Sequence, residues 1–176
     1  QDYPNLEIII SDNCSNDNTK EIVRSFTDAR IEYIRQKTNI GPNGNYNACL
    51  NSAKGEYFLL LHDDDLIDDD FVTTCLAAAK HSTNYGFIRT GARLIGEDGE
   101  LLKNEPNLVY SNSPDEMLLA WASFKSSFYL CSTLFNTRAL KEIGGFKSHN
   151  NIFEDGFCII KLSAHHPILN IVDIKA

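Results

Sequence analysis

Residues 53–66 read AKGEYFLLLHDDDL, an apolar run that ends in three adjacent carboxylates. The run from Tyr57 to Leu61 is short and apolar, which predicts a buried strand. Carboxylates packed at the end of a buried strand repel one another unless a cation neutralises them. A divalent cation bound at Asp63 to Asp65 is therefore the simplest explanation of this stretch. Few oxygen ligands with open coordination positions suit Mg²⁺ or Mn²⁺.

The spacing of the carboxylates excludes a calcium-binding EF-hand loop. Counting from Asp63, position 6 is Asp68, where such a loop needs glycine, and position 12 is Thr74, where it needs glutamate. The second acidic run, Asp68 to Asp70, falls at the start of a helix that we expect over 69–81. Negative charge there suits the positive end of the helix dipole. We therefore interpret this second run as a solvated helix start and assign it no chemistry.

Strands and helices alternate through the first half of the chain, residues 1–85. The patterns predict strands at 6–11, 31–35 and 57–61, and helices at 19–26, 43–53 and 69–81. Asn18 and Glu21 have the spacing of a capping box at the start of the first helix. Such alternation predicts an α/β fold with a mostly parallel central sheet covered on both faces.

The second half, residues 86–176, has a mixed pattern. Residues 87–95 and 101–103 flank a polar turn and predict a hairpin. The sequence SPDE at 113–116 is a strong helix start before 117–124. Further elements are expected as a strand at 130–135 and helices at 137–143 and 154–165. With 176 residues and 43% apolar side chains, the chain is expected to form one domain with these two halves.

Composition narrows the class of protein and its partners. A net charge of −8 disfavours nucleic acid as a partner and would repel a phosphorylated ligand unless a cation intervened. Five cysteines without a CxxC pair argue against a disulfide framework and favour a reduced compartment, so we expect a cytoplasmic location. No apolar run approaches the ~20 residues that span a bilayer.

Two polar loops follow predicted strands and carry aspartates. They are residues 12–17, after the strand LEIIIS, and residues 62–65, after the strand at 57–61. In open α/β sheets, ligands bind beyond the carboxyl ends of the strands. Both loops are therefore candidates for a ligand site.

Three motifs in this order carry a family resemblance: SDNCSNDNT at 11–19, NIGPNGNYNACLNSAKGEYFLLLHDDDL at 39–66, and IGGF at 143–146 followed by ED at 154–155. Together they resemble the nucleotide-diphospho-sugar glycosyltransferases of family 2, which have the GT-A fold, a Rossmann-like three-layer α/β/α arrangement. The family opens with a further strand and helix that have no counterpart here, so the resemblance implies a fragment of a longer chain.

The resemblance also implies an activity. It is metal-dependent transfer of a sugar from a nucleotide diphosphate, with a UDP-sugar as the expected donor, to a carbohydrate or glycolipid acceptor in bacterial surface polysaccharide or glycolipid synthesis. Peripheral association with the inner face of the membrane is compatible with this role. Acceptor choice is expected to lie in residues 89–152.

The resemblance assigns the family's donor-site roles to this chain residue by residue. Asp12, with Asn13 beside it, resembles the aspartate that reads the nucleobase. Asn47 matches the family's ARN motif as a nucleotide-binding residue, although Tyr46 replaces the arginine. Asp63 takes the variable position of the family's LDADD motif and is expected to contact the nucleotide.

Metal and catalytic roles carry over in the same way. Asp64 inherits the metal-ligand role with Asp65 beside it, whereas His62 replaces the first aspartate of the motif and is available to metal or ribose. Glu154 and Asp155 resemble the family's ED pair. Asp155 is the expected general base, with Glu154 as the alternative.

The chemistry of transfer explains two separate acidic sets. A metal stabilises the diphosphate as it leaves, and a carboxylate on the opposite face takes the acceptor proton, which together predict an inverting displacement. Two alternatives remain. One is a catalytically inactive sugar-nucleotide-binding module, and the other is an aspartyl-phosphate phosphotransferase built on Asp63 and Asp65. Ile67, where that enzyme class has Thr or Val, weighs against the second.

Overall fold

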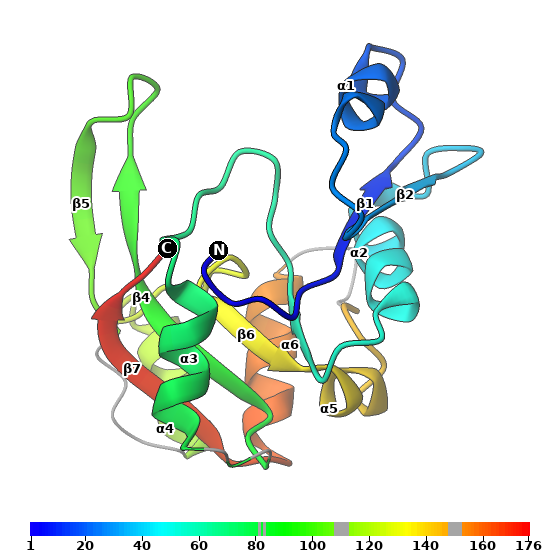
Figure 1. Ribbon diagram of the computed structural model, residues 1–176. Helices are drawn as coiled ribbons and strands as arrows, with labels where there is room; N and C mark the ends of the chain where they lie inside the picture. Colours follow the sequence, from blue (N-terminus) through cyan, green and yellow to red (C-terminus); the bar gives the residue numbers. More distant parts are fainter. Residues whose placement is uncertain (81, 83, 108–112, 148–152) are drawn as a thin grey trace.

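The computed structural model describes residues 1–80, 82, 84–107, 113–147 and 153–176. Strands and helices alternate from β1 to β4, after which β5 follows β4 directly and α6 follows α5 directly (Figure 1). In chain order they are β1 Ile8–Asp12, α1 Thr19–Ser25, β2 Ile31–Arg35, α2 Gly41–Ser52, β3 Tyr57–Leu59, α3 Phe71–Ala79, β4 Phe87–Ile95, β5 Leu101–Glu105, α4 Pro114–Ala122, β6 Thr133–Asn136, α5 Thr137–Glu142, α6 Glu154–Ser163 and β7 Ile168–Ile174.

The strands form two sheets, and their pairing corrects the prediction of a mostly parallel central sheet. β1 and β2 pair in parallel as a sheet of their own. The larger sheet has the order β3-β6-β4-β5, with β7 also pairing β4. Only the β4–β7 pair in it is parallel, whereas β3–β6, β4–β6 and β4–β5 are antiparallel. The prediction was wrong because β6, from the second half, inserts between β3 and β4, which follow each other along the chain.

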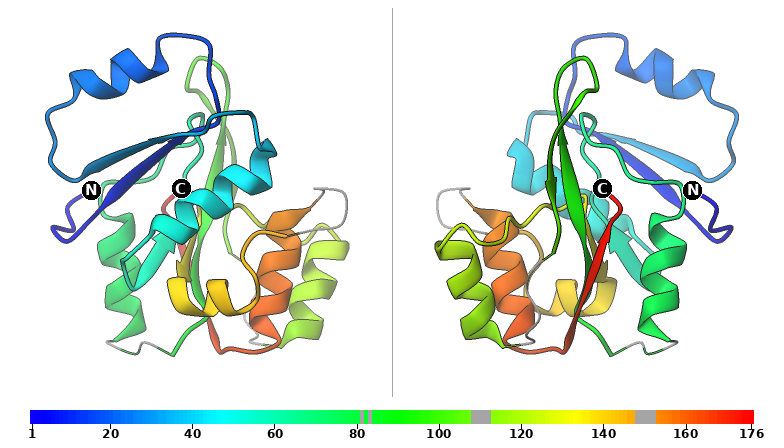
Figure 2. Two further views of the ribbon diagram at one scale, coloured as in Figure 1. Left: turned by 90° about the vertical axis from the view of Figure 1, so that its right-hand side faces the viewer. Right: turned by 90° about the vertical axis from the view of Figure 1, so that its left-hand side faces the viewer.

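The larger sheet is covered by helices on both faces, as the three-layer prediction requires (Figure 2). On one face α3 packs through Phe71 and Cys75, both fully buried. On the other face α6 and α4 contribute Ile159, Leu162 and Met117 to the main core. Burial of these apolar side chains is the main term that holds the three layers together.

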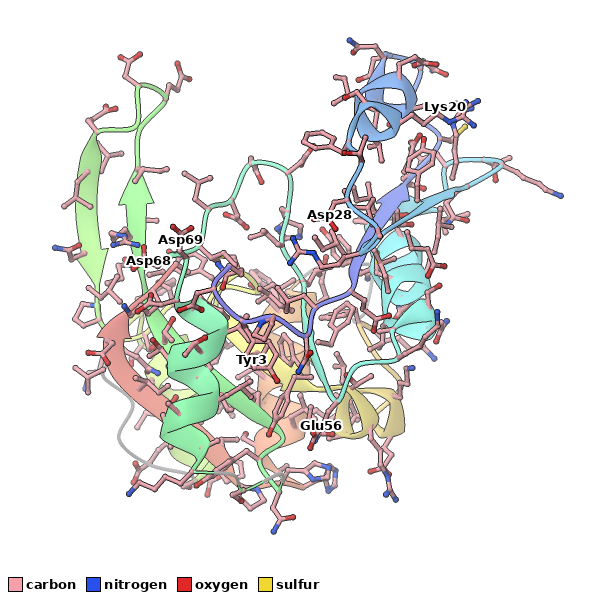
Figure 3. All side chains as sticks on the ribbon, in the orientation of Figure 1. Tyr3, Lys20, Asp28, Glu56, Asp68 and Asp69 are labelled. Atoms are coloured by element: carbon pink, nitrogen blue, oxygen red, sulfur yellow. The ribbon has the colours of Figure 1, made fainter. Side chains whose placement is uncertain are left out.

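The start of α3 differs from the sequence-based expectation. The helix begins at Phe71, so the aspartates of the second acidic run precede it and do not form its first turn. Lys175 binds the Asp70 carboxylate at 2.8 Å, and Arg93 binds that of Asp68. Figure 3 shows Asp68 and Asp69 beside the start of α3. Two of these carboxylates remain partly exposed and tie the loop before α3 to β4 and to the C-terminal segment.

Two further local predictions need correction. The Asn18 side chain makes no capping hydrogen bond to α1, because Asp17 Oδ1 accepts from the Thr19 amide at 3.0 Å instead. β7 was not expected, since its alternation is weak in sequence. It is a strand because it pairs with buried β4, where Phe87 lies opposite Ile168. The hairpin β4–β5 and the start of α4 at Pro114 are as predicted.

Candidate active site

The loop after β3 gathers three groups that are able to hold a metal ion. One ligand atom each from His62, Asp64 and Asp65 lies within 4.8 Å of the others. His62 Nδ1 is 3.3 Å from Asp65 Oδ2, whereas the buried His62 Nε2 has no hydrogen-bond partner among the described residues. Asp63 is exposed and stands outside this group. The structure therefore brings the Asp64 and Asp65 carboxylates together with the His62 imidazole.

Tyr46 of α2 lies near both sets of acidic groups. Its ring centroid is 5.2 Å from that of His62 and 5.9 Å from that of Phe146. Burial raises the pKa of the Tyr46 phenol. Nearby carboxylates raise it further, and these belong to Glu154, Asp64, Asp155 and Asp63. The two acidic sets, far apart in the sequence, therefore face the same phenol.

Asp155 stands in the first turn of α6, next to Glu154. Its Oδ1 accepts from the Gly156 amide at 2.7 Å. Burial raises the pKa of Asp155, the Glu154 carboxylate adds to this, and His62 acts in the opposite direction. A carboxylate with a raised pKa and a histidine nearby is suited to taking up a proton.

The start of α6 is held by an aromatic pair. Phe153, which precedes the helix, has left-handed backbone with φ of 60°. Its ring meets that of Trp121 edge-on, with centroids 5.6 Å apart. A Cβ at Gly156 would lie 3.0 Å from the Trp121 ring, so glycine allows this close approach. Trp121 packs against the main core and also contacts the start of α6, where the ED pair lies.

Asn47 has a different surrounding from the one its predicted role suggests. Its Nδ2 donates to the carbonyls of Asn43 and Phe146, both at 2.8 Å, and its Oδ1 accepts from the Phe146 amide at 2.9 Å. The oxygen and the nitrogen of the Asn47 amide are thus both bonded to backbone groups. Phe146 lies 99 positions from Asn47 in the sequence. Asn47 joins α2 to the segment after α5, and its geometry does not favour a nucleotide contact.

Asp12 ends β1 and is 5% exposed. Tyr33 donates to its Oδ2 at 2.5 Å, the Ser15 amide donates to Oδ1 at 2.7 Å, and Arg35 forms an ion pair at 3.2 Å. Burial alone would raise the pKa of Asp12, but these hydrogen bonds and the guanidinium lower it to about 2. The ionised carboxylate therefore organises the loop 12–17 from within.

Asn13 links that loop to the segment before α2. Its Nδ2 donates to Asn39 Oδ1 at 3.0 Å, and its Oδ1 accepts from the Ile40 amide at 2.9 Å. Asn45 adds a second link, because it accepts from the Ser11 hydroxyl at 2.6 Å and donates to the Ser11 carbonyl at 2.9 Å. Sequence reasoning missed Asn45, Tyr33 and Arg35, and the only signal available was their place near the motifs.

Comparison with known proteins places this geometry in a family. The model of glycosyl transferase family 2 matches residues 1–144. The chain belongs to glycosyl transferase family 2. The family resemblance predicted from the motifs is thereby confirmed.

Several bacterial glycosyltransferases are similar to this chain. A GalNAc(5)-diNAcBac-PP-undecaprenol beta-1,3-glucosyltransferase of Campylobacter jejuni is 38% identical over 107 residues, which is 58% of this chain and 33% of that protein. A UDP-Glc:alpha-D-GlcNAc-diphosphoundecaprenol beta-1,3-glucosyltransferase of Escherichia coli is 38% identical over 81 residues, 46% of this chain and 31% of that protein. The matched region spans about a third of the length of these relatives.

A solved structure confirms the GT-A fold. A mannosyltransferase from Pyrobaculum calidifontis, in complex with GDP-Man and Mn²⁺, superposes with a TM-score of 0.69 at 17% identity. The match covers 99% of this chain and 49% of that one. Within the described part of this chain, no helix has the length and apolarity that crossing a bilayer requires.

Proposed function

We propose that this family 2 glycosyltransferase transfers a sugar from a UDP-sugar to an acceptor hydroxyl with inversion at the anomeric carbon. The observation that carries the proposal is the meeting of two acidic sets around Tyr46 and His62. The first set, in the loop after β3, suits binding of a cation and the diphosphate. The second set, Glu154 and Asp155, suits uptake of a proton. A single in-line displacement needs these two tasks on opposite sides of the reacting carbon.

The residues present fit a divalent metal. His62, Asp64 and Asp65 offer one imidazole nitrogen and two carboxylates within 4.8 Å of one another, and the buried Nε2 of His62 lacks a partner among the described residues. Bound there, a divalent ion would neutralise charge on the leaving diphosphate. The mixed nitrogen and oxygen donor set favours Mn²⁺ over Mg²⁺, since Mg²⁺ prefers oxygen ligands. The Mn²⁺ in the mannosyltransferase structure supports this assignment.

Asp155 is the proposed general base. Its raised pKa places the carboxylate nearer to the working pH, at which an acceptor proton is taken most efficiently. Phe153 and Trp121 fix the start of α6, so the carboxylate is oriented before an acceptor arrives. Glu154 is the second candidate, because it lies beside Asp155 and also faces Tyr46.

The loop 12–17 is the proposed nucleotide site. Asp12 and Asn13 shape it through their internal hydrogen bonds, so their effect on the nucleotide is through the loop conformation as well as through any direct contact. Asp63 is exposed next to Tyr46, where a ribose or diphosphate contact is feasible. Asn47 is not included in the proposed nucleotide contacts, because its amide is bonded to backbone at both ends.

The acceptor is proposed to be a carbohydrate on a lipid diphosphate, with the enzyme working at a membrane surface in the cytoplasm. The names of the Campylobacter and Escherichia relatives, both acting on undecaprenol-linked sugars, support this. The Escherichia name also supports UDP-Glc as a donor to test first.

The test is a panel of UDP-sugars with Mn²⁺, in which binding is measured by calorimetry and release of UDP by a coupled assay. Release of UDP together with a product of inverted configuration by NMR supports the proposal. Binding without release supports the inactive-module alternative, and retention at the anomeric carbon contradicts the mechanism.

A further inference from the structure

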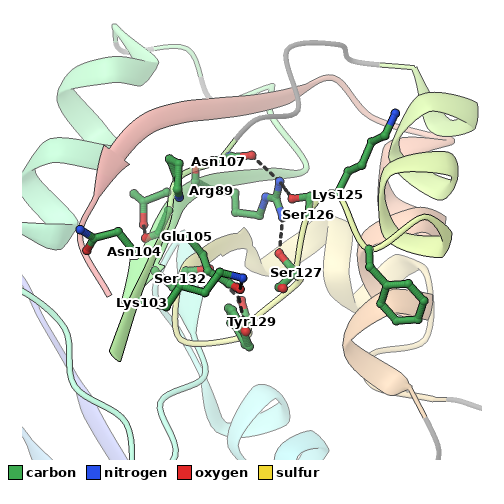
Figure 4. Close-up of a pocket in the computed structure, with 15 residues that line it drawn as sticks. Arg89, Lys103, Asn104, Glu105, Asn107, Lys125, Ser126, Ser127, Tyr129 and Ser132 are labelled. Atoms are coloured by element: carbon green, nitrogen blue, oxygen red, sulfur yellow. Dashed lines mark hydrogen bonds and ion pairs between the residues drawn. The ribbon is translucent and has the colours of Figure 1, made fainter. Parts of the chain in front are cut away.

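A cavity of about 200 Å³ lies between the β4–β5 hairpin and the segment 124–132 (Figure 4). It is separate from the acidic residues of the proposed donor site. Three cationic side chains line it, those of Arg89, Lys103 and Lys125, against one carboxylate, that of Glu105. In a protein with a net charge of −8, this is a local reversal of sign.

Arg89 of β4 is the centre of this cavity's charge and is only 1% exposed. Its guanidinium donates to the Ser127 carbonyl at 2.9 Å, to Ser126 Oγ at 3.1 Å, and to Asn107 Oδ1. It also lies over the Phe128 ring, 4.7 Å from the centroid. All of these partners are neutral. Burial accordingly lowers the pKa of Arg89 to about 10.

A buried guanidinium without a carboxylate is unfavourable, because desolvation of the charge is compensated only in part by neutral acceptors. Within the described residues, no acidic group forms an ion pair with Arg89. Glu105, the carboxylate in the same cavity, accepts instead from Lys103 Nζ at 2.6 Å and from the Tyr129 hydroxyl at 2.9 Å. The positive charge of Arg89 therefore has no counter-charge in the protein as described.

Beside Arg89, the side chain of Asn170 has a donor without an acceptor. Asn170 Oδ1 accepts from Asn107 Nδ2 at 3.0 Å and from Arg89 Nε at 3.4 Å. The amide nitrogen of Asn170, however, is buried with no partner among the described residues. The polar cluster around Arg89 thus has an excess of donors, which is what an anion-binding site requires.

One segment of the chain lies between the cavity and the metal-binding candidates. Tyr129 and Ser132 line the cavity, and Cys131 lies between them in sequence. Cys131 belongs to a small buried cluster against which Ile67 and Tyr129 pack. Ile67 follows Asp65 by two positions, so the segment that bounds the cavity also packs against the stretch that follows the metal candidates. The cavity therefore lies next to the part of the chain that carries them.

We propose that this cavity binds an oxyanion group, a phosphate or a carboxylate, of the sugar acceptor. The acceptor assignment rests on the proposed function, whereas the anion-binding property does not. The volume is below the roughly 300–1,000 Å³ of sites that enclose whole drug-sized ligands, so the cavity takes one group of the acceptor and not the entire molecule. Arg89 supplies the buried charge, and Lys103 at the exposed rim assists.

The test titrates inorganic phosphate and, separately, glucuronate into the metal-free protein without donor. The Nε–H resonance of Arg89 is followed by NMR, and glucose serves as the neutral probe. We expect a saturable shift with at least one of the two anions and none with glucose. A shift with phosphate alone assigns a phosphate-bearing acceptor, and a shift with glucuronate alone assigns a uronic acid. Absence of a saturable shift with both anions overturns the proposal.

Variants make the test specific. Arg89→Met should abolish the rise in melting temperature that the anion causes in the wild type. Since loss of a buried network can prevent folding, Lys103→Met provides the second test, because its side chain is 63% exposed. The Lys103→Met substitution should weaken anion binding at least about 5-fold, because loss of this cation also leaves the negative charge of Glu105 uncompensated. Lys54→Met removes a cation whose side chain is 79% exposed and should change nothing. Equal affinity in Lys103→Met and the wild type contradicts the proposal.

A competition experiment separates this inference from the proposed function. UDP with Mn²⁺ should leave the phosphate-induced shift of Arg89 in place, because donor and acceptor sites are distinct. Displacement by UDP would place the cavity in the donor site and overturn the acceptor assignment. Anion binding in a protein that neither binds nor hydrolyses any UDP-sugar would contradict the proposed function while supporting the oxyanion site.

Discussion

The ring of Tyr46 stands 5.2 Å from the ring of His62, at a tilt of 44°. Through this contact α2 meets the loop after β3, and the carboxylates of both acidic sets face the Tyr46 phenol. This aromatic contact therefore joins two parts of the motif at 39–66 that lie 16 positions apart in the sequence. Its consequences are testable at several positions.

Removal of a metal ligand should be detectable without turnover. We expect Asp64→Ala and His62→Ala each to weaken Mn²⁺ binding in the presence of UDP by at least about 10-fold, since a site with few protein ligands depends on every one. Electron paramagnetic resonance of free Mn²⁺ measures this. Asp69→Ala is the matched control, because it removes an equal charge outside the cluster. Unchanged binding in His62→Ala would remove the imidazole from the site.

Loss of the proposed base should separate binding from turnover. In Asp155→Asn we expect kcat to fall roughly 100-fold to 10,000-fold, with UDP and Mn²⁺ affinities unchanged, because the amide keeps its shape but cannot take a proton. In the wild type, the acidic limb of kcat/KM should lie above the ordinary carboxyl range, since burial raises the pKa of Asp155. Full activity in Asp155→Asn, with a loss in Glu154→Gln, would transfer the role to Glu154.

Gly145 should be intolerant of any side chain. Its φ is +71°, and a Cβ there would collide with Asn47 Oδ1 and lie 3.1 Å from Leu50 Cδ2. Gly99→Ala is the control, because φ is +78° there with nothing within 4 Å, so only backbone strain is added. We expect about 1 kcal/mol of destabilisation for Gly99→Ala and about 3 kcal/mol or more for Gly145→Ala, measured by urea unfolding. Equal losses would show that Asn47 moves aside freely.

Acid stability should depend on the hydroxyl of Tyr33. The pKa of Asp12 is lowered to about 2 in the folded protein, so the stabilisation is present above the unfolded value near 3.8 and is lost as the pH falls toward 2. Tyr33→Phe removes one of the hydrogen bonds that lower this pKa, so the midpoint of acid unfolding should move to higher pH. Circular dichroism during acid titration measures the midpoint. Tyr57→Phe should leave the midpoint unchanged, because the Tyr57 hydroxyl donates to the Ser82 carbonyl at 3.4 Å and not to a carboxylate of the described residues.

Local sequence determined most of the elements and the chemical character of the site. The pattern of apolar runs located β1 to β6 within a few residues, because burial of one or both faces of a strand requires apolar side chains at regular positions, whereas β7 was missed. The carboxylates after β3 were recognisable because adjacent negative charges at the end of a buried strand have few structural explanations, and the ED pair in the first turn of α6 was recognisable from the family resemblance. Family membership followed from the order of these motifs.

Tertiary structure alone decided how these pieces meet. β6 enters the sheet between β3 and β4, and Asn47 bonds the backbone of Phe146 across 99 positions. Neither contact leaves a local signal, because strand pairing and long-range hydrogen bonds depend on which surfaces the folded core brings together. The sequence therefore indicates a ligand contact for Asn47, whereas in the fold its side chain connects α2 to the segment after α5. In the sequence, Arg89 is likewise one polar residue in a strand. Only its burial against neutral partners shows that its positive charge has no ion-pair partner among the described residues.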